Sequence, residues 1–362
     1  MRVLFVNRAT AHTVFGGDTV QMMGTAAALR RLGVAIDFYQ RDQPVDYTCY
    51  DLIHFFNLSR PDTILYHLEQ TNLPAVVATI YMDYSYYRFA EVRPVVKWVS
   101  ILLGTHAIEY GKALYKHFKG SEKLKSKYYL LHGQRRSIAK VLRSVQLLLP
   151  NSDSETKRLH AHFDFDTPCQ TIFNGVDLQM FAGATQVVRD EKMVFCAARI
   201  EPMKNQYKAI VALNNTGYQL YLAGAPAPNH LQYYERCKAI AGPNIHFLGH
   251  LSQEALLHYY QRSAVHILPS RFETTGLASL EAAYMGCKIV VSDKGDTADY
   301  FKDHAVFCDP ECPQSILEAV NRAAAMPYDH QLRLKIEADY NWDAIAAQLL
   351  EAYKNVLKSK RA

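Results

Sequence analysis

Short, continuously apolar runs alternate along the chain with segments whose apolar residues recur at helical spacing. In the first half, strands are predicted at residues 2–6, 34–39, 51–56, 75–81, 145–150 and 171–173. In the second half, they are predicted at residues 193–199, 219–224, 244–249, 265–269, 288–293 and 306–309. Strands without polar alternation are typical of parallel sheets that helices cover on both faces. We therefore predict an α/β protein in which each half forms a doubly wound, Rossmann-like domain.

The length of 362 residues suits two such domains. A turn at Asn174-Gly175, followed by a polar stretch, predicts the boundary between an N-terminal domain at 1–175 and a C-terminal domain at 176–340. The final segment, 341–362, carries apolar residues at helical spacing, and no strand follows it. We expect this segment to form a helix that packs back across the junction between the domains.

Charge is unevenly distributed along the chain. Residues 97–143 contain eleven basic and two acidic residues, a local charge of +9 in a chain whose net charge is +5. The segment also mixes apolar residues with lysines, as helices at membrane interfaces do. It therefore indicates an anionic membrane surface as a partner, although an ordinary amphipathic helix with solvated lysines would look the same. Aromatic and arginine residues do not follow a nucleic-acid-binding pattern, so no nucleic-acid partner is expected.

The composition also bears on the cellular compartment. The seven cysteines form no C-x-x-C pair, which indicates free thiols in a reducing cytosol. No run of about 18 apolar residues occurs, so no transmembrane helix is predicted. We expect a cytoplasmic protein that binds, at most, to the inner face of the membrane.

Two groups of residues lie where strands of the predicted sheets end. Gly16 and Gly17 open a helix after the first strand, and a glycine pair there lets backbone N–H groups approach an anion. Arg199 and Lys204 follow the strand at 193–199, and two cations at that edge suit a diphosphate. Taken alone, each pattern also fits an ordinary solvated loop.

The stretch SRFETTGLASLEAAYMG contains two carboxylates in an otherwise apolar run. Glu273 lies in the loop after a predicted strand, and Glu281 lies in a helix expected to begin near Gly276. The first N–H groups of that helix are available to phosphate oxygens, and carboxylates are good acceptors for sugar hydroxyls. Spacing alone leaves open that Glu281 is a helix-surface glutamate.

Several sequence motifs follow one another along the chain in this order: NGVDLQMF, AARIEPMKNQ, YLAGAP, IHFLGHLSQEALLHYYQRSAVHILPSRFETTGLASLEAAYMG and VFCDPECPQSI. This set closely resembles the retaining nucleotide-sugar glycosyltransferases of family four, which have the GT-B fold. The resemblance is dense from about Phe173 to Val320 and thinner near the N-terminus. It implies two Rossmann-like domains that face each other across a cleft, with the C-terminal helix crossing the junction.

The resemblance also implies roles for individual residues. Glu273 resembles the residue that binds the donor sugar beside its anomeric carbon, and Glu281 the residue that holds the ribose. Arg199 and Lys204 match the diphosphate-binding cations. The remaining implied donor contacts are Gly17, from the N-terminal domain, the phosphate-facing loop Thr275, Gly276 and Leu277, and the nucleobase neighbours Ile200 and Leu251.

The sequence departs from the family in the loop after the strand at 75–81. Many members have a histidine there that faces the reacting sugar, whereas this chain reads Tyr81-Met82-Asp83-Tyr84. Tyr81 or Asp83 is the candidate replacement on the acceptor side, and an aromatic structural loop is the alternative. Thr275 stands where an aromatic residue is frequent.

The sequence thus predicts a retaining, metal-independent hexosyltransferase that uses a nucleotide-diphosphate sugar, with UDP-glucose favoured. The expected acceptor is a saccharide or a lipid-linked saccharide in polysaccharide biosynthesis. No cofactor is expected, and the D-x-D string at 164–166 lies among turn residues and is not predicted to hold a metal. The alternatives are another GT-B enzyme, such as a nucleotide-sugar epimerase or a sugar phosphorylase, and a non-catalytic sugar-nucleotide-binding module.

Overall fold

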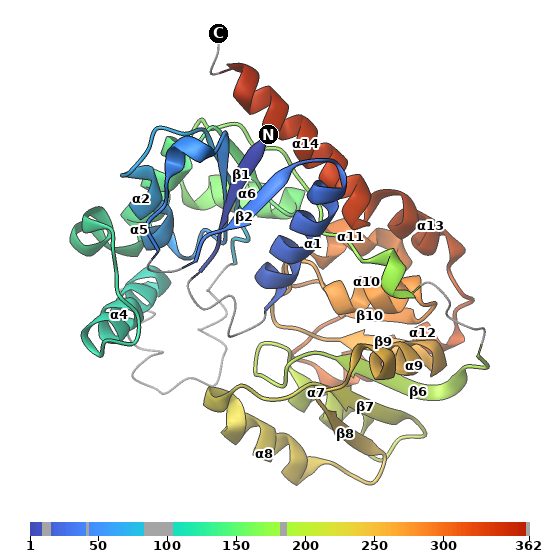
Figure 1. Ribbon diagram of the computed structural model, residues 1–362. Helices are drawn as coiled ribbons and strands as arrows, with labels where there is room; N and C mark the ends of the chain where they lie inside the picture. Colours follow the sequence, from blue (N-terminus) through green and yellow to red (C-terminus); the bar gives the residue numbers. More distant parts are fainter. Residues whose placement is uncertain (9–15, 41–42, 83–103, 182–186, 360–362) are drawn as a thin grey trace. The chain divides into compact units, whose positions relative to one another are not determined.

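The computed structural model describes residues 1–8, 16–40, 43–82, 104–181 and 187–359 (Figure 1). It divides into two compact units, the first formed by residues 1–174 and 342–362 and the second by residues 175–341. None of the helices in these described ranges is long and apolar enough to cross a lipid bilayer.

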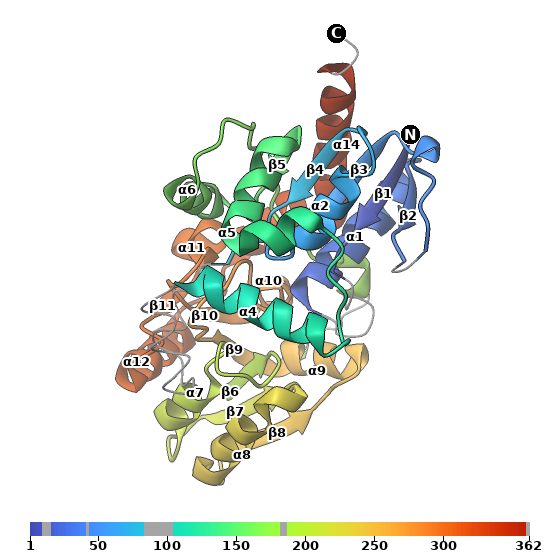
Figure 2. The same cartoon turned by 90° about the vertical axis from the view of Figure 1, so that its left-hand side faces the viewer.

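The first unit is built on a five-stranded parallel sheet with the order β2-β1-β3-β4-β5. Its strands are β1 (Arg2–Val6), β2 (Ala35–Phe38), β3 (Leu52–Phe56), β4 (Ala75–Ala78) and β5 (Leu147–Leu149). Its helices are α1 (Gly17–Arg31), η1 (Tyr47–Cys49), α2 (Pro61–Leu68), α4 (Thr105–Phe118), α5 (Lys127–Ser144), α6 (Asp153–His162) and α14 (Trp342–Ser359). Helices α4 and α5 run against each other, as Figure 2 shows. Two apolar clusters cover the opposite faces of the sheet.

Helix α14 contributes to one of these clusters and packs on α1. The contact depends on Gly24, because a Cβ at this position would lie 2.4 Å from the ring of Trp342. A buried hydrogen bond of 2.6 Å also joins Tyr353 to His54 of β3. The segment predicted to form the last helix therefore does so, and it completes the first unit.

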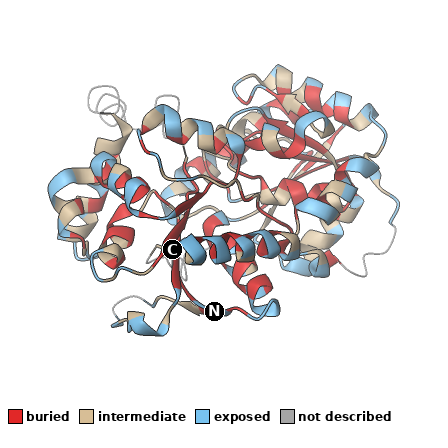
Figure 3. Ribbon diagram, turned by 90° about the horizontal axis from the view of Figure 1, so that it is seen from above, coloured by how far each residue is buried: buried red, intermediate tan, exposed pale blue. Residues whose placement is uncertain are grey.

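The second unit is built on a six-stranded parallel sheet with the order β11-β10-β9-β6-β7-β8. Its strands are β6 (Asp190–Ala197), β7 (Gln219–Ala223), β8 (Ile245–Gly249), β9 (Ser263–Leu268), β10 (Lys288–Ser292) and β11 (Val306–Cys308). Its helices are η3 (Leu178–Phe181), α7 (Gln206–Leu213), η4 (Pro228–His230), α8 (Leu231–Ile240), α9 (Gln253–Arg262), α10 (Leu277–Tyr284), α11 (Thr297–Phe301), η5 (Lys302–His304), α12 (Pro313–Ala325) and α13 (His330–Asp339). Figure 3 shows that the central strands are largely buried.

The strand order shows where successive strands stop being added on one side of a sheet and start being added on the other. In the second unit the order reverses between β6 and β9, which are neighbours although β7 and β8 lie between them in sequence. In doubly wound sheets, ligands bind at the carboxyl ends of the two strands that flank such a reversal. The loops after β6 and β9 are therefore where this unit is expected to bind a ligand.

The strand predicted at 171–173 is wrong. Residues 168–173 run beside β5, with Leu148 N–H bonded to Pro168 O and Ile172 N–H bonded to Pro150 O, but only an isolated bridge forms, between Leu148 and Cys169. Pro150 has no N–H group to return a bond toward the segment, so the ladder stops there. The other eleven predicted strands are present: the strand at 2–6 has the predicted ends, and the ends of the other ten are shifted.

Candidate active site

Lys204, in the segment after β6, and Glu273, in the loop after β9, meet at the carboxyl edge of the second sheet. Lys204 Nζ lies 2.5 Å from Glu273 Oε2, and the exposed fractions of the two side chains are 20% and 11%. A partly desolvated ion pair of this length is a charge-assisted hydrogen bond. The pair places one positive and one negative group together at the reversal between β6 and β9.

The backbone of Glu273 is fixed from its other side by the loop after β10. Its N–H donates to Lys294 O, and its carbonyl accepts from Asp296 N–H, at 3.1 and 2.8 Å. Between them, Gly295 has a φ of +97°, and a Cβ there would lie 2.2 Å from Glu273 O. Ser270 Oγ also lies 3.2 Å from Glu273 Oε2. The carboxylate is therefore held in a defined direction before any ligand arrives.

Arg199 lies near the same edge, two residues after β6 ends. Its Nη2 is 3.2 Å from Glu201 Oε1, and about half of its side chain is exposed. Gln206 braces this turn, because its amide donates to Arg199 O and accepts from Glu201 N–H. The guanidinium is thus anchored by one carboxylate and still open to an anion from solvent.

Helix α10 begins at Leu277, four positions after Glu273. Gly276 occupies the N-cap position with a φ of 74°, and Leu277 is the first helical residue. The first N–H groups of a helix have no partner within it and carry a partial positive charge. Ser279 Oγ, in this first turn, is buried and has no hydrogen-bond partner in the described chain, whereas Thr275 is buried with its hydroxyl 3.4 Å from Tyr300. This helix start suits an anion.

Glu281 lies one turn further along α10. Its Oε2 accepts a hydrogen bond of 3.0 Å from the hydroxyl of Tyr260, a fully buried residue of α9. Burial of the carboxyl raises the pKa of Glu281 to about 7, while the Tyr260 hydrogen bond acts in the opposite direction. The residue as a whole keeps partial exposure, while its carboxyl is the buried part.

The two nucleobase candidates also lie at ends of second-unit strands. Ile200 is buried and donates its N–H to Ala225 O after β7, and Leu251 follows β8 and is partly exposed. The second unit therefore brings the predicted cations, both glutamates and the α10 helix start to the carboxyl edge of one sheet.

The remaining candidates belong to the first unit. Gly17 is the exposed first residue of α1. Tyr81 is buried, its hydroxyl lies 2.9 Å from His162 Nδ1, and its backbone is held by Glu155 and Arg158. These contacts make the Tyr81 ring part of the core of the first unit. Asp83 lies outside the described residues.

Sequence reasoning missed several residues that hold these groups in place. They are Ser270 and Gly295 around Glu273, Glu201 beside Arg199, and Tyr260 beside Glu281. Gly295 lies in the turn sequence Asp293-Lys294-Gly295-Asp296, which is a recognisable signal for a tight backbone conformation. Tyr260, the partner of Glu281, carries no such signal, because this contact depends on how two helices meet.

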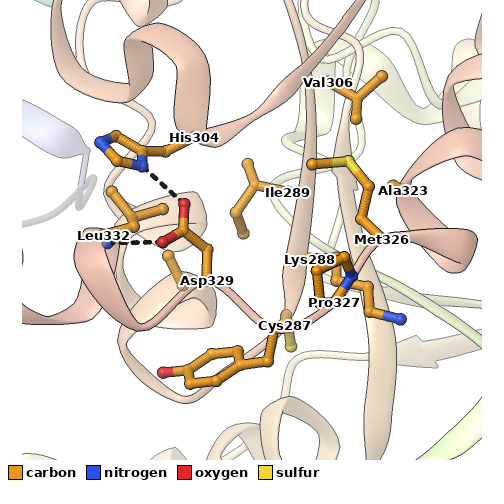
Figure 4. Close-up of a pocket in the computed structure, with 12 residues that line it drawn as sticks. Cys287, Lys288, Ile289, His304, Val306, Ala323, Met326, Pro327, Asp329 and Leu332 are labelled. Atoms are coloured by element: carbon orange, nitrogen blue, oxygen red, sulfur yellow. Dashed lines mark hydrogen bonds and ion pairs between the residues drawn. The ribbon is translucent and has the colours of Figure 1, made fainter.

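A separate pocket in the second unit lies between β10, α12 and α13 (Figure 4). Its cavity volume is about 20 Å³, and the described residues that line it include none of the predicted site. Within it, His304 Nδ1 lies 2.6 Å from Asp329 Oδ2, and the other oxygen of Asp329 caps α13. In the described ranges, no group of three or more His, Cys, Asp and Glu residues is arranged to hold a metal ion.

Comparison with known sequences identifies a family match and several relatives. Residues 182–340 match the family described as "Glycosyl transferases group 1". Glycogen synthase of Mycobacterium tuberculosis strain H37Rv is 26% identical over 203 residues, which cover 52% of this chain and 49% of that protein. D-inositol 3-phosphate glycosyltransferase of Nocardioides sp. is 23% identical over 252 residues, or 59% and 54% of the two chains. The chain thus spans about half the length of these curated relatives.

Solved structures match nearly the whole chain. Sucrose-phosphate synthase from Thermosynechococcus elongatus has a TM-score of 0.74 at 15% identity, and 99% of each chain is covered. HepE from Anabaena, solved in complex with UDP and glucose, has a TM-score of 0.66 at 14% identity, with 97% of this chain and 99% of that one covered. At these identities the likeness concerns the fold, which is that of GT-B glycosyltransferases.

Proposed function

We propose that the protein moves a hexose from a nucleotide-diphosphate sugar to an acceptor, because residues 182–340 match the family described as "Glycosyl transferases group 1". The acceptor is a saccharide or lipid-linked saccharide in polysaccharide biosynthesis, and UDP-glucose is the first donor to test. The observation that supports this assignment best is the contact between Lys204 and Glu273 beside the start of α10. It offers neighbouring groups for the phosphate and the sugar of one donor.

Three groups would bind the diphosphate. Arg199 supplies a half-exposed guanidinium, Lys204 an ammonium, and α10 the N–H groups that follow Gly276. Negative charge develops on the departing diphosphate in the transition state of sugar transfer, and fixed positive groups at that place lower its energy. These groups supply the charge for which other transferases use a metal, so we propose a metal-independent reaction.

Glu273 would position the sugar through its hydroxyl groups, since its carboxylate is fixed by Ser270 and by the loop around Gly295. In the reaction, the bond between the anomeric carbon and the diphosphate oxygen breaks, and its electron pair leaves with the diphosphate. The acceptor oxygen attacks from the same face, and its proton passes to the diphosphate. This retains the anomeric configuration and requires no protein base.

Glu281 would accept hydrogen bonds from the ribose hydroxyls. The Tyr260 hydroxyl is bonded to one of its two carboxylate oxygens, at 3.0 Å. The nucleobase would lie against the backbone near Ile200 and Leu251, which follow β6 and β8, the two strands on either side of β7. We propose that Gly17 of the first unit contributes a backbone contact to the donor.

The experiment that tests this function combines binding with turnover. Calorimetry with UDP-, GDP- and ADP-glucose identifies the nucleotide, and NMR with saccharide and lipid-linked acceptors detects released nucleotide and the product's anomeric configuration. Turnover that is lost in Glu273→Ala supports the proposal. Conversion of the donor without an acceptor would instead indicate an epimerase. Turnover that depends on inorganic phosphate would indicate a phosphorylase, and binding without turnover would indicate a non-catalytic module.

The first unit offers a surface for an anionic membrane at the cytoplasmic face. The exposed positions of α4 and its C-cap are Gly111, Lys112, Tyr115, Phe118 and Lys119. They repeat at helical spacing and bring two aromatic rings, exposed by 65% and 83%, beside two lysines. Exposed aromatic residues among lysines are typical of helices that lie in a membrane interface. Such a surface would bring the enzyme to a lipid-linked acceptor.

A further inference from the structure

Asn205 follows Lys204 directly and has an unusual backbone. Its φ and ψ angles are 60° and 33°, in the left-handed region, and the residue is completely buried. A left-handed conformation is strained for a residue other than glycine, although asparagine tolerates it better than most. Such strain persists only where the surrounding structure enforces it, and it is frequent at functional sites.

The side chain of Asn205 does not perform the role expected at the start of a helix. Asparagine at an N-cap usually accepts a hydrogen bond from an N–H group of the first turn. Here, no side-chain cap of α7 forms, and the Oδ1 atom is buried without a partner in the described chain. A buried oxygen without a partner destabilises a fold. Helix capping therefore does not account for this residue.

The amide nitrogen of Asn205 instead joins the ends of two other strands. Nδ2 donates to Pro269 O, after β9, at 3.2 Å and to Pro310 O, after β11, at 2.7 Å. Both partners are carbonyl oxygens, so only the amide nitrogen can face them, and an aspartate could not replace it. The residue beside Lys204 is thus tied to the start of the loop that carries Glu273.

A second set of contacts holds the other side of Lys204. Arg271 donates its backbone N–H to Met203 O at 2.8 Å and its guanidinium to Pro202 O at 2.9 Å. The segments 202–205 and 269–271 are therefore joined on both sides of Lys204. This arrangement fixes where the Lys204 backbone lies relative to Glu273.

We propose that Asn205 is a positioning residue for the reaction: its left-handed backbone and its amide hold Lys204 at ion-pair distance from Glu273, where the diphosphate of the donor is to bind. The catalytic part of this inference rests on the proposed transferase function. The geometric part does not, because it concerns only where the Lys204 ammonium is held.

The test compares Asn205→Gly with a matched control at the other end of α7. Glycine accepts the left-handed backbone without strain and removes only the amide. Asn215→Gly makes the same change at an exposed asparagine with a φ of 56°. Each variant enters the comparison if it unfolds cooperatively on heating. If Asn205→Gly does not unfold cooperatively, it is replaced by Asn205→Ser, whose hydroxyl keeps one hydrogen-bond donor.

The first measurement is independent of the reaction. The rate at which acetic anhydride modifies Lys204 is read by mass spectrometry and normalised to exposed lysines of the same chain. Release from the ion pair exposes the amine, so we expect modification of Lys204 to be about fivefold faster in Asn205→Gly and unchanged in Asn215→Gly. Equal rates in the wild type and Asn205→Gly would overturn the inference.

The second measurement uses turnover of UDP-glucose. Displacing a catalytic group slightly lowers kcat on the order of tenfold to a hundredfold, so we expect a loss of this size in Asn205→Gly. In a Lys204→Ala background, the same change should cost nothing further, because the group that it positions is gone. An equal loss with and without Lys204 would mean a general structural role and would refute the proposal. If the wild type turns over no donor, the transferase assignment fails, while the modification rate still decides the positioning role.

Discussion

Lys204 and Glu273 form an ion pair of 2.5 Å, although 69 positions separate them in the sequence. They meet because β9 returns to pair with β6 at the centre of the sheet. In this state each charge neutralises the other. A bound diphosphate would compete with the Glu273 carboxylate for the lysine, so donor binding has to rearrange this pair.

Replacing Glu273 by glutamine is therefore expected to affect turnover and nucleotide binding in opposite directions. Turnover of UDP-glucose should fall by about a hundredfold, because a fixed charge beside the reacting sugar is lost. UDP, which has no sugar, should bind several-fold more tightly, because the lysine no longer pairs with a carboxylate. Steady-state kinetics and calorimetry measure the two effects. Glu254→Gln, at an exposed position of α9, is the control and should change neither. Weaker binding of UDP to Glu273→Gln would contradict the competition.

Glu281 should make the stability of the second unit depend on pH. Its pKa is about 7 in the folded protein, against an ordinary value of 4.5, because the carboxyl is buried. Between these values the folded state retains a proton that the unfolded state releases. Unfolding free energy should then fall as pH rises from about 4.5 to 7, by at most about 1.4 kcal/mol per pH unit, and level off above 7. Thermal unfolding of the wild type and Glu281→Gln between pH 5 and 8 measures the difference. If the unfolding free energies of the wild type and Glu281→Gln change in parallel with pH, Glu281 does not contribute to the pH dependence.

Tyr260→Phe should move the pH dependence of donor binding. The Tyr260 hydroxyl lowers the pKa of Glu281 by bonding to its carboxylate. We expect UDP-glucose to bind more tightly as Glu281 ionises, and the midpoint of this change should shift to higher pH in Tyr260→Phe. Calorimetric titrations between pH 6 and 8.5 locate the midpoint. Tyr259→Phe, whose ring stacks on Phe195, is the matched control. An unshifted midpoint in Tyr260→Phe would show that the hydroxyl does not act on Glu281.

Gly24→Ala should destabilise the first unit by about 1–3 kcal/mol, because its Cβ would overlap the ring of Trp342 in a packed interface. The matched control is Gly111→Ala in α4, where no atom lies within 4 Å of the added Cβ. That change should instead stabilise its helix by up to about 1 kcal/mol through helix propensity alone. Urea unfolding followed by tryptophan fluorescence distinguishes the two results. Similar effects of both variants would argue against the Gly24–Trp342 contact.

The α4 surface predicts binding to anionic lipid. A Tyr115→Ser, Phe118→Ser double variant should reduce co-sedimentation with vesicles containing about 30% phosphatidylserine by about tenfold, because two aromatic anchors are lost. The matched control is Val188→Ser, at an apolar position of the second unit that is 91% exposed. Binding of the wild type that ignores the phosphatidylserine content would count against a role for Lys112 and Lys119.

Much of the site follows from local sequence. Arg199 and Lys204 follow one buried strand and Glu273 another, and parallel strands put their carboxyl ends at one edge. Sequence alone does not specify that β6 and β9 are neighbours, since strand order depends on long-range packing. The same holds for Tyr260 and Glu281, which come from two helices, and for the ties of Asn205 to Pro269 and Pro310.

Tyr81 illustrates the limit of reading a loop by its residue types. The family resemblance implies an acceptor-side role for this position, and in the structure its hydroxyl and backbone are engaged by partners on α6. Glu155, which begins α6 with Ser152 as its cap, supplies one of these contacts. Ser152 followed three residues later by Glu155 is a recognisable capping pattern in the sequence, whereas the sequence does not indicate that Glu155 reaches back to the end of β4.

The order in which the chain is synthesised gives the α14 contact a further consequence. A ribosome completes the whole second unit before Trp342 appears, at about 5–20 residues per second. Until then, the apolar stripe of α1 around Gly24 has no cover, so the half of the protein that is translated first must wait for the later half before its own core closes. A chaperone that recognises nascent apolar helices would find its target there during that interval.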